Sequence, residues 1–170
     1  MAGKKDQYSQ MGYMRVVESA ANTLTFAGLS VFSNVLGQKA MIIHRVEYLL
    51  STATPAFLVA DADAITFGLG GDDSLTTVAL DSPQIYDYNK IVRVDYGTAG
   101  VAFWDVEPIV KDYTMLPGGG KLVPADRLFV WAQGVSIASA ITVTARFEYT
   151  INDLSAQDYL ELAQSLRVLR

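Results

Sequence analysis

The sequence of 170 residues contains no cysteine and only one histidine, His44. Without cysteine there can be no disulfide bond, no cysteine-ligated zinc site and no thiol catalysis, so the fold depends on packing alone. Serine-histidine triads and multi-histidine metal centres need partners for His44, and no Gly-x-Ser-x-Gly or His-Glu-x-x-His pattern supplies them. Because His44 lies in mid-strand on an apolar face, we expect it to be structural.

Charge is also scarce, since Asp, Glu, Lys and Arg make up 18% of the chain and hydrophobic residues make up 51%. So low a charge density suggests that neighbouring subunits cover part of the surface, as in a homo-oligomer. The net charge is −5, from 13 Lys and Arg against 18 Asp and Glu. A protein that grips a phosphate backbone shows the opposite balance, so we expect no specific nucleic-acid partner.

No apolar run approaches the roughly 18 residues of a membrane span, and the first residues lack the apolar core of a signal peptide. We therefore expect the chain to be made and kept in a cytoplasm. Its length fits one domain with a substantial core. Residues 1–11 are polar and are predicted to form a mobile N-terminal arm, followed by a single domain over residues 12–170.

Alternation of apolar and polar residues predicts strands along most of this domain, most clearly over Ala140–Ile151. There Ile141, Val143, Ala145, Phe147, Tyr149 and Ile151 share the expected core face, and Arg146 and Glu148 lie on the other. Further strands are predicted over Tyr13–Ser19, Thr23–Ala27, Leu29–Leu36, Met41–Ser51, Phe57–Ala60, Thr76–Leu80, Ile85–Tyr96, Val101–Val110 and Arg127–Gln133.

Within Met41–Ser51, alternation places Ile42, His44, Val46, Tyr48 and Leu50 on one face, and Arg45 with Glu47 on the other. In Ile85–Tyr96 it places Tyr86 and Tyr88 opposite Asp87 and Asn89. Residues 61–74 are predicted to be mostly loop, apart from a short alternation at Ile65, Phe67 and Leu69. Gly97–Gly100 predicts a hairpin between the strands on either side, and Leu116–Pro124 predicts a loop.

The chain ends with a predicted helix over 155–169. Ser155 is the expected N-cap and Asp158 its capping-box partner, with Leu154 and Tyr159 in the staple positions. An apolar stripe, formed by Leu162, Leu166 and Leu169, needs a cover, which would be its own domain, a neighbouring subunit or a membrane surface. Eight to ten strands and one helix indicate an all-β fold, an antiparallel sandwich or barrel.

Four groups of residues could form a site. Asp105 and Glu107, beside Phe103 and Trp104, have the residue types of a glycosidase pair, but the pattern is weak and a solvated strand face explains them better. Asp61, Asp63, Asp72 and Asp73 could surround calcium if their loops meet, or cap turns. Gly118-Gly119-Gly120-Lys121 leads towards a strand and lacks a phosphate-loop pattern. Trp104 and Trp131 could form a sugar platform, or belong to a core or an interface. We assign no catalytic, cofactor or metal residue.

Three stretches give the chain a resemblance to a known family: Ile85–Val110, the Leu116–Pro124 loop, and Arg127–Ile151 running into 153–170. In length and strand order it resembles the small, single jelly-roll major capsid protein of tailless icosahedral membrane-containing phages and archaeal viruses, the sphaerolipovirus-like group. The resemblance implies a single jelly roll of about eight strands with a C-terminal helix. It also implies a non-enzymatic virion protein that assembles laterally with itself and a second capsid protein, over an internal membrane.

Two other functions remain open at this point. The aromatic residues and the aspartate-bearing loops are compatible with a carbohydrate-binding, lectin-like β-sandwich. A glycosidase acting through Asp105 and Glu107 is the enzymatic alternative.

Overall fold

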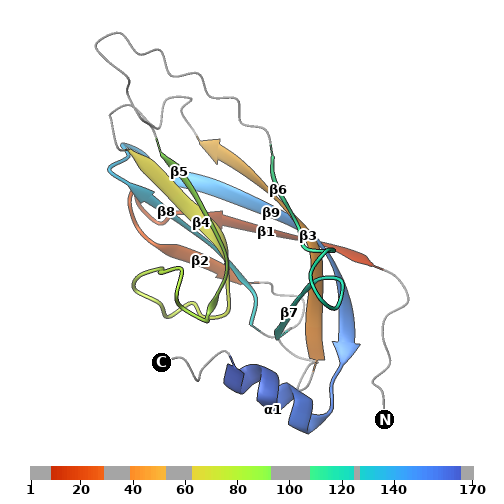
Figure 1. Ribbon diagram of the computed structural model, residues 1–170. Coiled ribbons are helices and arrows are strands. Elements are labelled where there is room, and N and C mark those ends of the chain that lie inside the picture. Colours follow the sequence, from red (N-terminus) through yellow and green to blue (C-terminus); the bar gives the residue numbers. More distant parts are fainter. Residues whose placement is uncertain (1–8, 29–38, 53–62, 93–107, 125–126, 166–170) are drawn as a thin grey trace.

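The computed structural model describes residues 9–28, 39–52, 63–92, 108–124 and 127–165, in which antiparallel strands predominate (Figure 1). The elements in chain order are β1 (Gln10–Val17), β2 (Thr25–Gly28), β3 (Lys39–Thr52), β4 (Ala64–Gly70), β5 (Ile85–Val92), β6 (Ile109–Asp112), β7 (Lys121–Pro124), β8 (Phe129–Val135), β9 (Ile141–Asp153) and α1 (Ala156–Ser165). The strands expected over 29–36 and 57–60 lie outside the described residues.

The strands form two sheets, in the orders β1-β9-β3-β6 and β2-β8-β4-β5, and β7 also pairs with β3. β6 lies opposite Arg45–Tyr48 and β7 opposite Ala40–Ile43, so the two form one interrupted strand along β3. Eight strands thus build two four-stranded antiparallel sheets, with the first strand beside the last. This order is that of a jelly roll, which confirms the predicted antiparallel sandwich.

The core fills the space between the sheets, and β9 supplies much of it. Ile141, Val143, Ala145 and Phe147 are completely buried, and Tyr149 nearly so. The alternation predicted for this strand is therefore confirmed, with Ile151 packed at the core's margin. β1 starts at Gln10, two residues before the domain boundary expected at residue 12, because Gln10 and Met11 pair with β9.

A β-bulge in β3 corrects the faces predicted for that strand. The pairing of β3 with β9 shifts between Ile43 and Arg45, so His44 is the additional residue. Before the bulge Met41 and Ile43 enter the core, and after it Val46, Tyr48 and Leu50 do. Simple alternation put Ile42 and His44 on the core face, which is wrong because one extra residue reverses the faces of all residues before it.

β4 is a fully buried central strand, where mostly loop was predicted. Its glycines weakened the strand signal, yet they make room for a large neighbour. An added Cβ on Gly68 or Gly70 would lie 3.2 Å or 3.6 Å from the Trp131 ring, which is completely buried. Tyr88 packs on the same indole, with ring centroids 5.5 Å apart.

In β5, Tyr88 lies opposite Asp87 and Asn89, as the alternation predicted, and the polar side chains are on the inner face. In its register with β4, Ile91, Asn89 and Asp87 lie opposite the core residues Ile65, Phe67 and Leu69. Asp87 and Asn89 therefore point into the sandwich, whereas Tyr88 faces outward. Polar residues can occupy this inner face because they find hydrogen-bond partners there, which a hydropathy pattern does not reveal.

Three further expectations differ from the structure. β5 and β6 belong to different sheets and do not pair with each other, whereas the turn of the expected hairpin, at 97–100, lies outside the described residues. Residues 76–80 form bends and a turn instead of a strand, and the end of the expected 116–124 loop is strand β7. β7 was missed because four residues between glycines and a proline give too short an alternation to recognise.

α1 lies beyond the end of the sandwich, beside β7 (Figure 1). Its predicted start is confirmed, since the Asp158 amide donates to Ser155 Oγ (3.1 Å) and Ser155 Oγ donates to Asp158 Oδ2 (2.7 Å). Of the predicted apolar stripe, Leu162 is half-buried, and Leu166 and Leu169 lie outside the described residues. Leu160, which was not assigned to the stripe, is exposed. No helix in the described part of the chain is long and apolar enough to cross a membrane.

Candidate interaction surface

The outer face of the β1-β9-β3-β6 sheet carries an unusual number of large apolar side chains. Met11, Tyr13 and Val17 project from β1, Leu49 from β3 and Val110 from β6, and each is between 46% and 63% exposed. We call these five residues and the polar residues between them the outer face. Strands of a half-buried sheet normally place polar residues towards water, so an apolar outer face indicates contact with another molecule.

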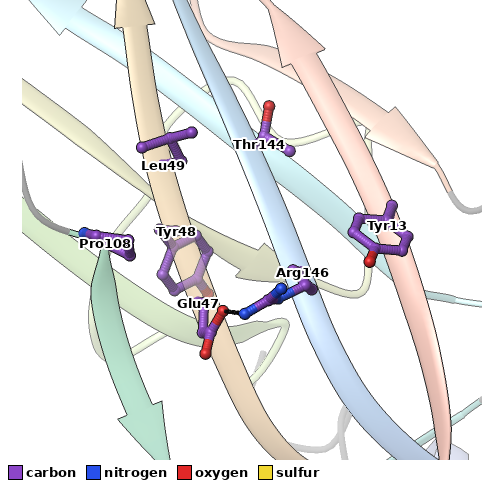
Figure 2. Close-up of a pocket in the computed structure, with 7 residues that line it drawn as sticks. All are labelled: Tyr13, Glu47, Tyr48, Leu49, Pro108, Thr144 and Arg146. Atoms are coloured by element: carbon purple, nitrogen blue, oxygen red, sulfur yellow. Dashed lines mark hydrogen bonds and ion pairs between the residues drawn. The ribbon is translucent and has the colours of Figure 1, made fainter.

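A shallow trough of about 270 Å³ crosses this face (Figure 2). It is lined by residues of β1, β9 and β3 and by the residue before β6: Tyr13, Glu47, Tyr48, Leu49, Pro108, Thr144 and Arg146. Apolar atoms dominate the lining, and the trough is partly open to solvent. Its shape suits an inserted side chain of a protein partner better than an enclosed small molecule.

An ion-pair cluster forms one wall of the trough. Glu47 accepts a hydrogen bond from Arg146 (Figure 2) and forms an ion pair with Arg45 at 2.8 Å. The Glu47 carboxylate raises the pKa of Arg146. Although exposed pairs of this kind contribute little to stability, they hold their charges in defined positions, which matters for recognising a partner.

A second polar cluster is built around Asp87, inside the sandwich. Asp87 Oδ2 accepts hydrogen bonds from the Tyr48 hydroxyl (2.7 Å) and from Asn89 Nδ2 (2.9 Å), and Lys111 Nζ lies 3.9 Å from Oδ1. Burial, followed by the charge of Asp87, raises the pKa of Tyr48 well above its ordinary value. The pKa of the partly buried Tyr113 is raised by the same two causes. This cluster links the two sheets and is structural.

The raised pKa values predict alkaline sensitivity. Tyr48 and Tyr113 keep their protons in the folded state at pH values where unfolded phenols, with a pKa of about 10, lose theirs. The stability they contribute is therefore complete below about pH 10 and is lost as the pH rises further. Above about pH 10, the raised pKa of Tyr48 alone should lower the free energy of unfolding by up to about 1.4 kcal/mol per pH unit. The contribution of Tyr113 should be smaller because solvent screens this side chain.

Urea denaturation between pH 8 and pH 11.5 measures this loss. Tyr48→Phe should flatten the alkaline slope, whereas Tyr13→Phe, the control on the exposed outer face, should leave it unchanged. An identical slope in wild type and Tyr48→Phe would contradict the prediction.

His44 is bound on both sides within the fold. Its Nδ1 lies 2.7 Å from the Gly119 carbonyl oxygen and its Nε2 3.1 Å from Thr150 Oγ1. Since a carbonyl oxygen can only accept, Nδ1 carries a proton in this arrangement. The ring thus ties the β6–β7 loop to β9, which is the structural role expected of it.

The aspartates considered for calcium are separated by β4. Asp63 precedes this strand and is buried, whereas Asp72 and Asp73 follow it. Seven extended residues span roughly 23 Å, too far for Asp63 and Asp72 to share an ion. Asp72 instead accepts hydrogen bonds from the amide and hydroxyl of Ser74, as a turn former. Among the residues that the structure describes, no group of three or more His, Asp or Glu could hold a metal ion.

The remaining candidates contribute no site in the described parts of the chain. Asp61, Trp104, Asp105 and Glu107 lie outside them, so the predicted glycosidase pair stays a prediction. Trp131 is completely buried and cannot serve as a sugar platform. Gly118 and Gly119 have positive φ values of 89° and 75° and turn the loop into β7, as expected for a loop that leads to a strand.

Only part of the outer face was predicted from the sequence. Alternation placed Arg45 and Glu47, and Arg146 and Glu148, on polar strand faces. The apolar residues of the face were missed. A signal was present in β1, where Met11, Tyr13 and Val17 alternate with Met14 and Val16, so both faces of this strand carry large apolar residues.

Comparison with known proteins gives little further guidance. No protein-family model and no curated protein matches the sequence. A solved structure of maize chlorotic mottle virus, determined by single-particle analysis, matches 92% of this chain and 95% of its own with 11% identity and a TM-score of 0.33. So distant a likeness carries no weight for function, which must be inferred from the chain's own surface.

Proposed function

We propose that the protein is a structural, non-enzymatic subunit of a viral capsid that assembles through lateral contacts between jelly-roll sandwiches. Its place is then the virion, after synthesis in the host cytoplasm. The outer face supports this most directly, because five large apolar side chains stand exposed on a sheet whose inner face is otherwise well packed. A jelly roll has two broad flat faces, and covering one by a neighbour turns the molecule into a building block.

The finer proposal is the small major capsid protein of the sphaerolipovirus-like group, which the sequence resembles. In that setting a second capsid protein completes the shell, and an internal membrane lies beneath it. The net charge of −5 fits a shell placed over lipid better than one placed directly on nucleic acid.

We expect purified protein, alone or with a second capsid protein, to form closed particles visible by negative-stain electron microscopy. Tyr13→Lys/Leu49→Lys should reduce particle yield at least tenfold, because it places two charges in the apolar contact. Leu80→Lys is the matched control, since Leu80 is 75% exposed in a loop away from the sheet. A wild type that stays monomeric at high concentration and enters no particle would contradict the proposal.

A lectin-like module is the alternative, and it is now less well supported because Trp131 is buried. A glycan array screened with and without calcium tests it, and no binding would leave it without support.

A further inference from the structure

We infer that the outer face binds the same face of a second copy, about a two-fold axis that runs parallel to the strands between β9 and β3. The inference rests on the proposed function as a subunit and adds to it the partner and the geometry of one contact. Such an isologous contact requires a surface that is complementary to itself.

The strand pairing arranges the outer face in rows that run across the sheet, from β1 through β9 and β3 to β6. The first three rows are Met11-Glu148-Arg45-Asp112, Tyr13-Arg146-Glu47-Val110 and Arg15-Thr144-Leu49. Each row thus contains one outward-facing residue from each strand. Successive rows follow one another along the strand direction.

The four charges at the centre alternate in both directions. Glu148 and Arg45 are neighbours in the first row, and Arg146 and Glu47 are neighbours in the second with the signs reversed. A two-fold axis between β9 and β3 places Glu148 of one copy over Arg45 of the other, and Arg146 over Glu47. All four charges of each copy then face an opposite charge, which favours this partner over an unrelated surface.

Of the apolar residues at the β1 end, Tyr13 meets an apolar partner under this operation, whereas Met11 in the first row comes to lie over Asp112. Tyr13, at the β1 end of the second row, comes to lie over Val110 at the β6 end. The troughs of the two copies face each other, with Thr144 over Leu49. Apolar contacts thus flank a charged centre.

An axis across the strands, between the first two rows, would also match the four charges. It would, however, superimpose the third row on positions beyond Gln10, where β1 begins. The axis along the strands keeps every row of the outer face over its own counterpart, including the third row and that of Val17. This difference decides between the two orientations.

The size of the face indicates a weak contact. Four strands about 4.8 Å apart, and four rows about 6.8 Å apart including that of Val17, make a plate of roughly 500 Å² with its side chains. A stable complex buries about 800 Å² from each partner. We therefore expect association at high protein concentration, and stable association only where several contacts act together.

Two charge-reversal variants test the pairing. In Glu47→Arg or Arg146→Glu the second row carries two like charges, which face two like charges in a second copy. The self-association constant of each variant alone, measured by sedimentation velocity at low salt, should therefore be at least tenfold lower than that of wild type. An equimolar mixture of the two should associate at least as strongly as wild type, because two positive charges then face two negative ones.

The double variant Glu47→Arg/Arg146→Glu tests the orientation of the axis. It restores opposite charges about an axis along the strands, but it places Glu148 over a new glutamate about an axis across them. We expect it to associate like wild type. Asp73→Arg, in an exposed loop, is the control and should change nothing. Circular dichroism confirms that each variant is folded.

Several results would overturn the inference: a monomeric wild type, single variants that associate like wild type, a mixture that does not recover, or a double variant that fails to associate. If particles form but the charge variants do not change the association of two copies, the capsid proposal stands and only this contact is wrong. If the face binds a second capsid protein and no homodimer forms, the inference is equally overturned. Absence of both particles and pairs would remove the proposed function as well.

Discussion

Gly68→Ala is expected to lower the free energy of unfolding by about 3 kcal/mol, at the upper end of what overpacking costs. Gly68 lies in the middle of β4, paired with Tyr88 of β5. A Cβ at this position would run into the main-chain carbonyl of Asp87. A flexible side chain could yield to the new methyl group, but here a backbone group of the neighbouring strand has to move.

Movement of that carbonyl also disturbs what is attached to it. Asp87 binds the Tyr48 hydroxyl across the sandwich, and the Trp131 ring lies 3.2 Å from the position of the new methyl group. The strain therefore spreads to the link between the sheets and to the largest buried side chain.

Chemical denaturation with urea, followed by tryptophan fluorescence, measures the effect. Gly70→Ala is a matched control on the same strand and face, where the nearest group is the Gln84 carbonyl at 3.3 Å. It should cost clearly less than Gly68→Ala. Equal stability of Gly68→Ala and wild type would show that β4 and β5 are less tightly paired than described.

Glu18→Ala is expected to cost a similar amount, about 3 kcal/mol, through lost hydrogen bonds. Glu18 follows β1 and is 3% exposed. One carboxylate oxygen accepts from the Gly134 amide (2.5 Å) and the other from the Ile141 amide (2.9 Å). The carboxylate thereby joins β1 to the end of β8 and the start of β9.

Removing the carboxylate leaves two buried amides without their acceptor. Each unsatisfied amide lowers the free energy of unfolding by about 1–3 kcal/mol. Glu18→Gln should be intermediate, because its amide group can accept one bond but turns a donor towards the other amide. Asp73→Ala, an exposed loop carboxylate, should stay within about 0.5 kcal/mol of wild type. Thermal and urea unfolding check all three, and a fully stable Glu18→Ala would mean that other groups satisfy the two amides.

Strong alternation and local capping were sufficient to predict β9, β3 and the start of α1. The capping box at Ser155 and Asp158 is encoded within four residues, so no distant contact is needed to recognise it. The antiparallel sandwich followed from the number of strands and the spacing of their turns. These features are local, and local patterns are what a single sequence reveals most directly.

Features that depend on distant residues could not be predicted in the same way. The bulge at His44 is held by Gly119 and Thr150, which are 75 and 106 positions away. The inward direction of Asp87 depends on Tyr48, and the strand character of glycine-containing β4 depends on Trp131. The outer face was missed for the same reason, since its rows exist only once β1, β9, β3 and β6 are side by side.

The pairing of β1 with β9 also determines when this sheet can form during synthesis of the chain. β1 leaves the ribosome early, but its partner β9 is the last strand of the sheet, about 120 residues later. At 5–20 residues per second, β1 waits roughly 6 to 25 seconds for its partner. Throughout that interval a strand with large apolar residues on both faces has open edges and can pair with other nascent chains. Emergence of β9, and not of the first strands, therefore allows this sheet to form and ends the period in which β1 has no partner strand.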